Sequence, residues 1–309
     1  AELHPGQILV LTFSEKAAAE MRARIFRAVS SAGLGYNRLD LADAPISTFH
    51  SYGARLMRDY SLTAGIDPAL PMLTEVDTDV ILDGAVLSFL ERGYEKAYTF
   101  NPLDKTVYSW EDGGPPWVAR SIIEQLRNQA VRVKEFNEAW MMADDLADRP
   151  AVLAPLVGHL YRVYQSILHR RGQMDFDRLI MGTVDLLEHN PGLRSLARRQ
   201  CRAILVDEYQ DTNYAQERML RGIAEEGMTN VTVVGDPRQA IYVWREARVE
   251  NIAEFPGNGD ERVETPLSQN WRSLKPILDV ANKAIDGYDF GEPPEFDGNR
   301  RLEPAQDAI

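Results

Sequence analysis

The sequence predicts an α/β protein in which a parallel sheet is interrupted by a long, all-helical insertion. The apolar runs ILVLTF at residues 8–13 and AILV at residues 203–206 contain no charged residue, which is typical of strands in a buried parallel sheet. Between them, residues 61–190 place apolar side chains at three- and four-residue intervals and show no convincing strand. A chain of 309 residues is long enough for two such units.

The N-terminal segment predicts strand, turn and helix twice in succession. After residues 8–13, Ser14 is suited to cap a helix, whose apolar positions recur at Ala18, Met21, Ile25 and Val29. A second short strand around residues 45–48 leads into FHSYGARLMRDY, which we expect to form a turn followed by a helix.

The helical insertion ends with QMDFDRLIMGTVDLLEHN, which returns the chain to the sheet. Beyond residues 203–206 we expect a helix at 214–225, a further buried strand at 231–236 and a helix within NWRSLKPILDVANKAI. We therefore assign residues 1–60 and 191–285 to the sheet domain, 61–190 to the insertion, and 286–309 to a linker or the start of another domain.

Composition narrows the class of protein. With 44% hydrophobic and 26% charged residues, the chain has the composition of a soluble globular protein. The single cysteine, Cys201, cannot form an internal disulfide, and no membrane span or secretory signal is visible. We therefore expect a cytoplasmic protein without a membrane partner. The net charge of −13 argues against nucleic acid as a partner, although only the contacting face must be positive.

Two adjacent carboxylates, Asp207 and Glu208, follow the apolar run 203–206. Ligands of open α/β sheets bind at the carboxyl ends of the strands. One carboxylate there can hold Mg²⁺, and its neighbour can orient or deprotonate a water beside a nucleotide phosphate. A strand followed by an acidic, solvated loop is the alternative. A metal-dependent nuclease using Asp207, Glu208 and Asp236 is a further alternative, although the chain supplies no obvious additional ligands.

Polar or aromatic residues follow five predicted strands, in LTF, TFHS, VDEYQD, VGDPRQAIYVWR and LSQNWRS. Their order and spacing resemble the UvrD/Rep family of superfamily 1 DNA helicases over residues 8–285. TFSEKAAAEMRARI resembles motif Ia of that family and STFHSYGARL the motif after it. ILVDEYQDTN resembles motif II (Walker B), VVGDPRQAIYVWR motif III and LSQNWRS motif IV. The resemblance implies a RecA-like sheet of the P-loop NTPase type with an all-helical inserted subdomain.

The resemblance also implies ATP and Mg²⁺ as cofactors. Asp207 would hold the metal, and Glu208 would activate the attacking water. Gln239 would sense the γ-phosphate, and Arg272 would stabilise the charge that develops on it. Trp271 would stack on the adenine, where the family usually has tyrosine. The implied nucleotide contacts are Gln210, Gln239, Trp271 and Arg272.

On the DNA side, the resemblance implies single-strand contacts from Thr12, Phe13, Thr48, His50, Tyr242, Trp244 and Arg245. Phe13, Tyr242 and Trp244 would stack on unpaired bases, each stack contributing about 1–3 kcal/mol, and Thr12, His50 and Arg245 would contact sugars and phosphates. Core packing is the alternative for Tyr242 and Trp244, and a structural role is the alternative for His50. The implied partners are single-stranded DNA, junctions of single and double strands, and repair or recombination proteins.

No G-x-x-x-x-G-K-[ST] phosphate-binding loop occurs in the chain, which begins with Ala1 rather than methionine. We therefore expect a fragment. The resemblance implies that its parent is a 3′-to-5′ DNA helicase acting in repair or recombination, whose second motor domain follows residue 285. Alone, the fragment should bind ATP poorly and hydrolyse it scarcely at all. A function of a different class, an ATPase-inactive module that binds single-stranded DNA or a repair partner, is the alternative.

Overall fold

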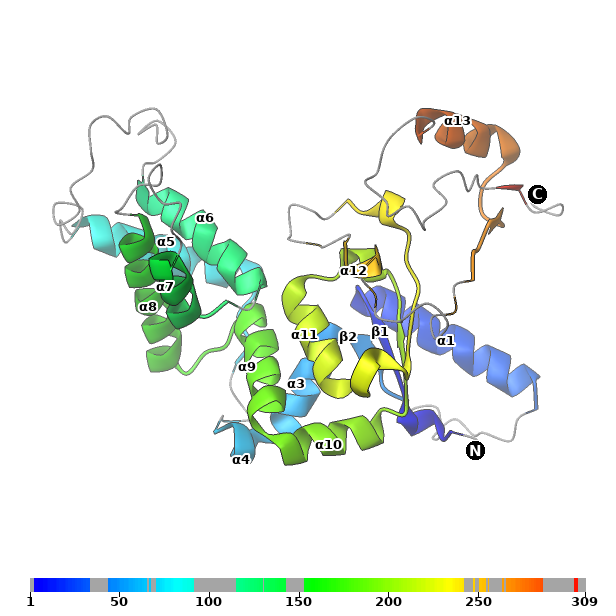
Figure 1. Cartoon of the computed structure of the whole chain (residues 1–309), viewed down its shortest axis with the longest axis horizontal. Helices are drawn as coiled ribbons and strands as arrows, with labels where there is room; N and C mark the ends of the chain where they lie inside the picture. The colour runs from blue at the N-terminus through cyan, green and yellow to red at the C-terminus, as the bar shows by residue number, and fades with distance from the viewer. Residues whose placement is uncertain are drawn as a thin grey trace.

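The computed structural model has two lobes, which Figure 1 shows side by side. One lobe contains a parallel sheet with the helices that cover it, and the other consists of helices only. The structure describes residues 3–33, 44–65, 67, 71–91, 115–129, 131–142, 153–241, 247, 250–253, 255, 263, 265–285 and 303–304.

The sheet has four parallel strands in the order β2-β1-β3-β4. The strands are β1 (Ile8–Thr12), β2 (Ile46–Thr48), β3 (Ala203–Val206) and β4 (Val231–Val233). In the register of the central pair, Leu11 lies beside Val206. Because all four strands run in the same direction, their carboxyl ends meet at one edge. The predicted parallel sheet, with strands from both sides of the insertion, is confirmed.

Helices cover the two faces of the sheet unequally. One face carries Leu9, Leu11, Ile204 and Val206, which share a core with α3 (Phe49–Asp59), α9 (Phe176–His189) and α11 (Tyr214–Ile223). On the other face, α1 (Glu15–Ser31) packs against Val10 and Ile46. The predicted cap of α1 is confirmed, since Ser14 Oγ accepts a hydrogen bond from Ala17 N at 3.1 Å. α10 (Pro191–Gln200) leads into β3.

Two strands are less covered than the sequence predicts. Leu205 in β3 is 40% exposed, so the expectation that this run is buried on both faces is wrong for that residue. β4 lies at the edge of the described sheet and ends at Val233, with Thr232 exposed, so the prediction of a buried strand over 231–236 is also wrong. Both exposed residues share the face of Val10, because in-register neighbours point the same way, and α1 covers only the β1–β2 half of that face.

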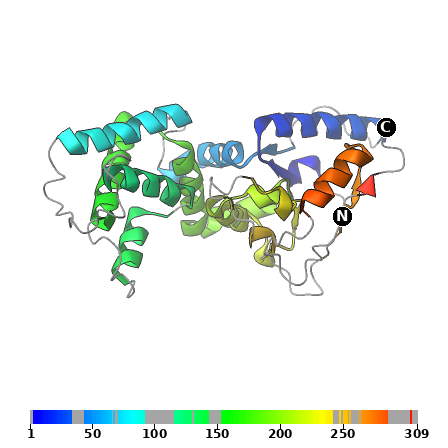
Figure 2. The same ribbon diagram turned by 90° about the horizontal axis from the view of Figure 1, so that it is seen from above.

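The second lobe is a helical bundle with its own hydrophobic core. It consists of α5 (Glu75–Glu91), α6 (Pro115–Asn128), α7 (Val133–Met142) and α8 (Leu153–Arg171). α8 packs against the other three and contributes Leu156, Leu160 and Tyr164 to the core. Figure 2 shows α5 along one side of this lobe and α1 along the corresponding side of the sheet lobe. Where the structure describes residues 61–190, the predicted absence of strands is confirmed apart from one bridge between Met72 and Met174.

α9 lies between the lobes, and its core residues belong with the sheet. Leu179, Ile180 and Leu187 pack in the same core as β1 and β3. α8 ends at Arg171, and Gly172 directly after it has a φ of 57°, a left-handed conformation suited to glycine. The predicted limit of the insertion at residue 190 stays a prediction, and we propose a boundary near Gly172 because of this packing.

The remaining elements are short and lie mainly toward the C-terminus. They are η1 (Pro5–Gln7), α4 (Ser61–Ala64), η6 (Tyr209–Asp211), η7 (Glu226–Met228), η8 (Pro237–Gln239), α12 (Glu250–Ala253), β5 (Gln269–Asn270), α13 (Lys275–Ile285) and β6 (Glu303–Pro304). β5 and β6 form a separate parallel pair. No helix in the described ranges combines the length and the apolar character needed to cross a membrane.

Candidate nucleotide and nucleic-acid site

A cavity of about 600 Å³ lies between the carboxyl edge of the sheet and the helical insertion. The sheet side of its wall includes the strand-end residues Thr12, Phe13, Thr48, His50, Asp207 and Glu208. The opposite side comes from α5, α6 and the start of α9. Predicted nucleotide and DNA residues from three strand ends therefore lie on one wall, as expected for parallel strands.

The acidic pair takes its position from the end of β3. Asp207 N donates to Leu11 O at 2.9 Å, which holds Asp207 beside β1. Glu208 has φ 51° and ψ 46°, a left-handed conformation that is uncommon for a residue other than glycine. The turn exposes Glu208 while Tyr209 and Gln210 are buried behind it. Such strain persists where surrounding contacts fix the backbone, and it clusters at functional sites.

Hydrogen bonds connect Glu208 to the residue predicted to sense the γ-phosphate. Gln210 Nε2 donates to Glu208 Oε2 at 2.7 Å, and Gln210 Oε1 accepts from Asp236 N at 3.1 Å. Asp236 Oδ2 in turn accepts from Gln239 Nε2 at 2.9 Å. A chain of three hydrogen bonds thus joins the turn after β3 to the turn after β4, with the buried Gln210 at its centre.

Gly235 makes this connection possible because a side chain would not fit there. A Cβ at this position would lie 2.6 Å from Gln210 Oε1 and 2.8 Å from Ile252 Cδ1. Glycine is the residue that permits so close an approach of the backbone to another group. The turn after β4 therefore requires glycine in order to touch Gln210.

Burial and mutual repulsion raise the pKa values of two acids in this turn, Asp207 and Asp211. Burial, together with the charge of Glu208, raises the pKa of Asp207 above its usual value. The same two causes raise the pKa of Asp211 to about 6. Asp211 Oδ1 is buried and has no hydrogen-bond partner within the described structure. A cation bound beside these carboxylates would favour their ionised forms.

Replacing Asp211 with asparagine should stabilise the protein above pH 6. A carboxyl with an unfolded pKa of about 3.9 and a folded pKa near 6 binds a proton more readily when folded. The stability from this proton is fully present below about pH 4 and is lost as the pH rises through 6. The urea midpoint of Asp211→Asn should exceed that of wild type at pH 7 and converge on it near pH 4. Glu226→Gln, at an exposed position outside the cavity wall, is the charge-matched control. If the urea midpoints of Asp211→Asn and wild type differed by the same amount at every pH, the raised pKa of Asp211 would be contradicted.

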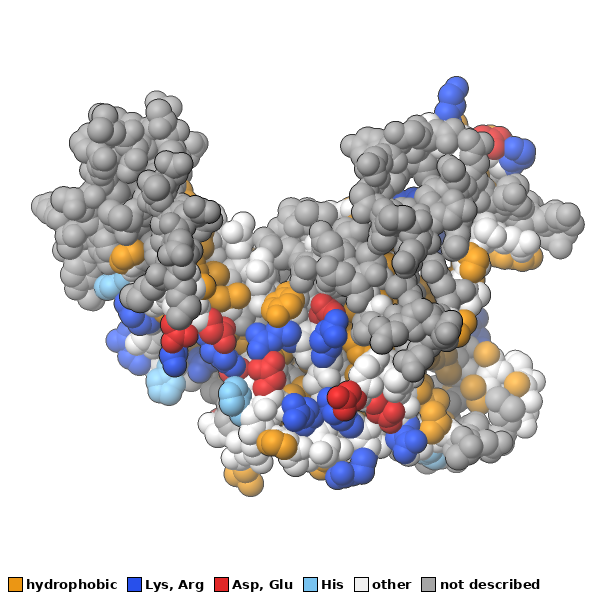
Figure 3. All heavy atoms as spheres, viewed as in Figure 1, with side chains coloured by type: hydrophobic (Ala, Val, Ile, Leu, Met, Phe, Trp, Pro, Cys, Tyr) orange, Lys and Arg blue, Asp and Glu red, His pale blue; other side chains and the backbone are white. Residues whose placement is uncertain are grey.

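The cavity wall is acidic in the described part of the chain. Its acidic members are Asp79, Glu124, Asp177, Asp207, Glu208 and Asp211, and Arg127 is the one Arg or Lys among its described residues. On the face seen in Figure 3, acidic and basic side chains are interspersed without a continuous basic patch among the described residues. Phosphate groups are repelled by such a wall, whereas cations are attracted to it.

Aromatic rings from three elements line the same cavity. Phe13 follows β1, His50 lies at the start of α3, and Phe176 begins α9. The side chains of Phe13 and Phe176 are each 39% exposed, and the His50 and Phe176 rings meet edge to face with centroids 5.3 Å apart. Phe176 was not predicted as a site residue, because its exposure at the start of α9 cannot be read from the segment QMDFDRLI.

The two threonines predicted to touch DNA are buried on the cavity wall. Thr12 Oγ1 donates to Ser14 O at 3.1 Å. Thr48 caps α3, accepting from Ser51 N at 3.1 Å, and donates to Glu15 Oε1 at 2.8 Å. Their hydroxyl groups therefore hold the turns after β1 and β2. Their predicted contacts with DNA stay predictions.

Several predicted residues are not brought to this cavity. Gln239, Trp271 and Arg272 are not among its lining residues, and Trp271 is 67% exposed between β5 and α13. Arg272 N donates to Asn270 Oδ1 at 2.9 Å, which shapes the turn after β5. The remaining DNA candidates, Tyr242, Trp244 and Arg245, lie outside the described residues.

The donors at the turn after β3 fit a magnesium ion only as part of a larger ligand set. Across the described ranges, no cluster of three or more His, Cys, Asp or Glu residues is arranged to hold a metal. Mg²⁺ usually keeps several waters and binds one or two carboxylates together with substrate phosphates, so Asp207 suits this mode. A metal-dependent nuclease would need Asp207, Glu208 and Asp236 to lie together as metal ligands. The described residues do not form such a cluster.

Comparison with known proteins places the chain in a family. The chain is similar to ATP-dependent DNA helicase PcrA of Bacillus subtilis (33% identical over 287 residues, 92% of this chain and 34% of the relative). It is also similar to PcrA of Leuconostoc citreum (32%; 91% and 33%) and to ATP-dependent DNA helicase UvrD1 of Mycobacterium leprae (32%; 91% and 33%). The chain spans about a third of the length of these curated relatives. Since the family model described as UvrD/REP helicase N-terminal domain matches residues 1–259, the chain belongs to that family.

Proposed function

We propose that this chain is the first motor domain, with its helical insertion, of an ATP-dependent helicase that moves along single-stranded DNA. The observation that supports this most directly is the chain of hydrogen bonds from Glu208 through Gln210 and Asp236 to Gln239. It joins a candidate general base to a candidate phosphate sensor, beside a cavity with exposed aromatic rings. The relatives named above are ATP-dependent DNA helicases, which agrees with the proposal.

In this proposal each residue of the turn after β3 has a separate task. Asp207 contributes a carboxylate to Mg²⁺, and Glu208 accepts a proton from the attacking water. When bound, Mg·ATP supplies the phosphoanhydride bond whose hydrolysis releases the free energy for movement. Gln210 fixes one oxygen of Glu208 at 2.7 Å, which leaves the other oxygen for the water. Gln239 and Arg272 stay assigned to the γ-phosphate, and Trp271 to the adenine.

The DNA part of the proposal follows from the chemistry of the cavity wall. Phe13, His50 and Phe176 offer ring surfaces to unpaired bases, while the acids around them repel the phosphates. Stacking is tolerant of sequence because every base has a π-face. We extend the proposal to 3′-to-5′ movement, to junctions of single and double strands, and to a setting in repair or recombination.

Unwinding by the full-length protein tests the proposed function. With ATP and Mg²⁺, the protein should separate duplexes that carry a 3′ single-stranded tail, leave those with a 5′ tail paired, and hydrolyse ATP faster when single strands are added. Unwinding of the 5′-tailed duplex alone would overturn the polarity. Tight binding of single strands without any ATP turnover would favour the ATPase-inactive module. That alternative is worth testing because residues 1–309 contain no G-x-x-x-x-G-K-[ST] motif.

A further inference from the structure

A buried polar cluster lies where the insertion meets the start of α9. Asp175, 1% exposed, accepts hydrogen bonds through Oδ2 from Arg127 Nη2 at 3.1 Å and from the Tyr164 hydroxyl. Its Oδ1 accepts from Arg178 N at 2.6 Å, which caps α9. Arg127 is 5% exposed and also pairs with Asp177 at 2.6 Å. Residues from α6, α8 and α9 thus converge on one carboxylate.

Stability alone does not account for such a cluster. Replacing a buried ion pair by apolar side chains of similar volume is often neutral or stabilising, because removing two charges from water is costly. What the charged groups add is direction, since each hydrogen bond fixes an angle as well as a distance. Burial lowers the pKa of Arg127, but the negative charges of Asp177 and Asp175 raise it by more than burial lowers it. The guanidinium therefore stays charged.

The residue that this geometry directs is Phe176. It follows Asp175 directly as the first residue of α9, and its exposed ring lies on the cavity wall against His50. Because Asp175 caps the helix, the direction in which α9 begins sets where the Phe176 ring points. Arg127 and Tyr164 hold Asp175 from the insertion side, so the insertion controls that direction.

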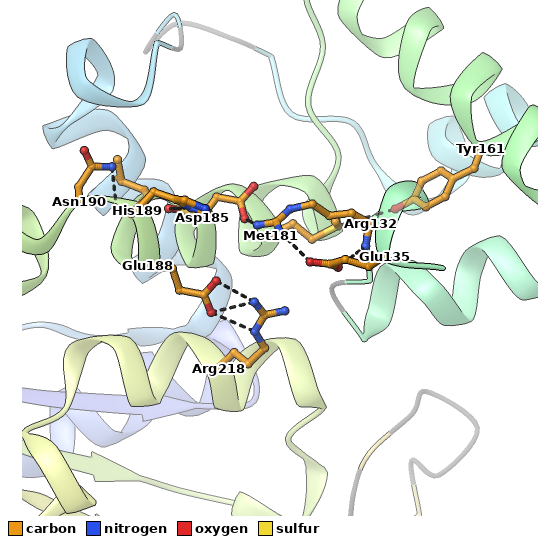
Figure 4. Close-up of polar contacts among 10 residues, drawn as sticks. Arg132, Glu135, Tyr161, Met181, Asp185, Glu188, His189, Asn190 and Arg218 are labelled. Carbon is orange, nitrogen blue, oxygen red and sulfur yellow. Dashed lines mark hydrogen bonds and ion pairs between the residues drawn. The ribbon is translucent and has the colours of Figure 1, made fainter. Parts of the chain in front are cut away.

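α9 is fixed to the sheet lobe farther along its length, as Figure 4 shows. Arg218 of α11 donates through Nη2 to both carboxylate oxygens of Glu188 at 2.8 Å. On the side of the insertion, Arg132 pairs with Asp185 and with Glu135. The C-terminal half of α9 is therefore anchored both to the sheet lobe and to the insertion, and the cluster at its N-terminus is the insertion contact that directly precedes Phe176.

We propose that Arg127 and Asp175 are positioning residues for single-stranded DNA, through which the insertion holds the Phe176 ring where an unpaired base stacks. The inference rests on the proposed function, because it requires the cavity to bind single strands. It assigns to the helical insertion, which also lines the cavity through α5 and α6, an indirect share in base binding. The ligand chemistry is the π-face of any base, so the effect should not depend on sequence.

A double-mutant cycle on the 309-residue chain tests this inference. The dissociation constant for a fluorescein-labelled oligothymidylate is measured for Arg127→Met, Phe176→Ala and the double variant. Phe176→Ala should weaken binding about fivefold or more, the lower end of one base stack. Arg127→Met should weaken it to a similar degree in wild type but less than about twofold once Phe176 is absent, because its effect passes through that ring.

Arg120→Met is the matched control. Arg120 lies two turns earlier on α6 and pairs with Asp83 and with the cavity-wall acids Asp79 and Glu124. Its loss removes the same charge beside the cavity but no contact with α9. Arg120→Met should change the dissociation constant by the same factor whether position 176 is phenylalanine or alanine. Quenching of 2-aminopurine in the oligonucleotide reports stacking directly and should fall in Arg127→Met but not in Arg120→Met.

A milder variant decides the matter if Arg127→Met does not fold. Asp175→Asn keeps a good helix cap but removes the ion pair, and it should repeat the Phe176-dependent loss. Equal losses for Arg127→Met or Asp175→Asn with and without Phe176 would overturn the inference, since the effect would then not pass through the ring. A normal dissociation constant for Phe176→Ala itself would instead overturn the assignment of the cavity as the base site.

Discussion

Glutamine in place of Glu208 should lower ATP turnover by the full-length protein at least about 100-fold, which is the lower range for loss of a general base. The amide cannot accept a proton from the attacking water, yet it is nearly isosteric and retains an oxygen for the hydrogen bond from Gln210 Nε2. The fold and the affinity for single strands should therefore stay close to those of wild type. Steady-state hydrolysis with saturating single-stranded DNA is the measurement.

The control for this variant is a second glutamate-to-glutamine change outside the site. Glu225 is exposed, lies just after α11 and is not on the cavity wall, so Glu225→Gln should keep wild-type turnover. If Glu208→Gln also hydrolysed ATP at a near-normal rate, Glu208 would have no part in the chemistry. The left-handed turn that presents it would then need another explanation.

Alanine at Gly235 should lower ATP turnover by a similar factor, on the order of 100-fold, without touching any predicted catalytic side chain. The new Cβ would lie 2.6 Å from Gln210 Oε1, so Gln210 must move. Because Gln210 Nε2 holds Glu208, the carboxylate moves as well, and a misplacement of about 1 Å costs roughly 100-fold in rate. Overpacking against Ile252 should also reduce the free energy of unfolding by about 1–3 kcal/mol.

Gly84 provides the matched substitution for this experiment. It lies within α5, and a Cβ there would meet nothing within 4 Å. Gly84→Ala should leave turnover unchanged and raise stability slightly, since alanine is the better helix former by about 0.5–1 kcal/mol. Turnover and unfolding midpoint are measured for both variants. Normal turnover in Gly235→Ala would show that Gln210 does not position Glu208.

Local sequence patterns predicted the four strands of the sheet, although not the extent or the exposure of β4. The apolar run before Ser14 and the capping position of Ser14 depend on neighbours within a few residues, and both are confirmed. The exposure of Leu205 could not be predicted in this way, because it depends on which helix covers that half of the sheet face. Helical spacing likewise shows that α9 is a helix but not that its apolar side packs against β1 and β3.

The same division applies to the candidate site. The sequence was sufficient to predict that residues at strand ends, such as Phe13, His50 and Glu208, lie near one another, because parallel strands end at one edge of the sheet. Contacts between separate turns were not visible. Nothing in the spacing of Gln210 and Asp236 indicates that an amide joins them, and nothing in QMDFDRLI shows that its phenylalanine faces the cavity.

Two backbone hydrogen bonds hold the first and last residues of the helical lobe side by side. Leu73 N donates to Met174 O at 2.8 Å, and Met174 N donates to Pro71 O at 3.1 Å. The folded lobe therefore adds only this short gap to the chain between β2 and β3. The entropy lost when those strands take their places in the sheet then depends mainly on residues 49–70 and 175–202, not on the length of the lobe. Lengthening or shortening the bundle at its far end leaves the register of β1 with β3 unaffected.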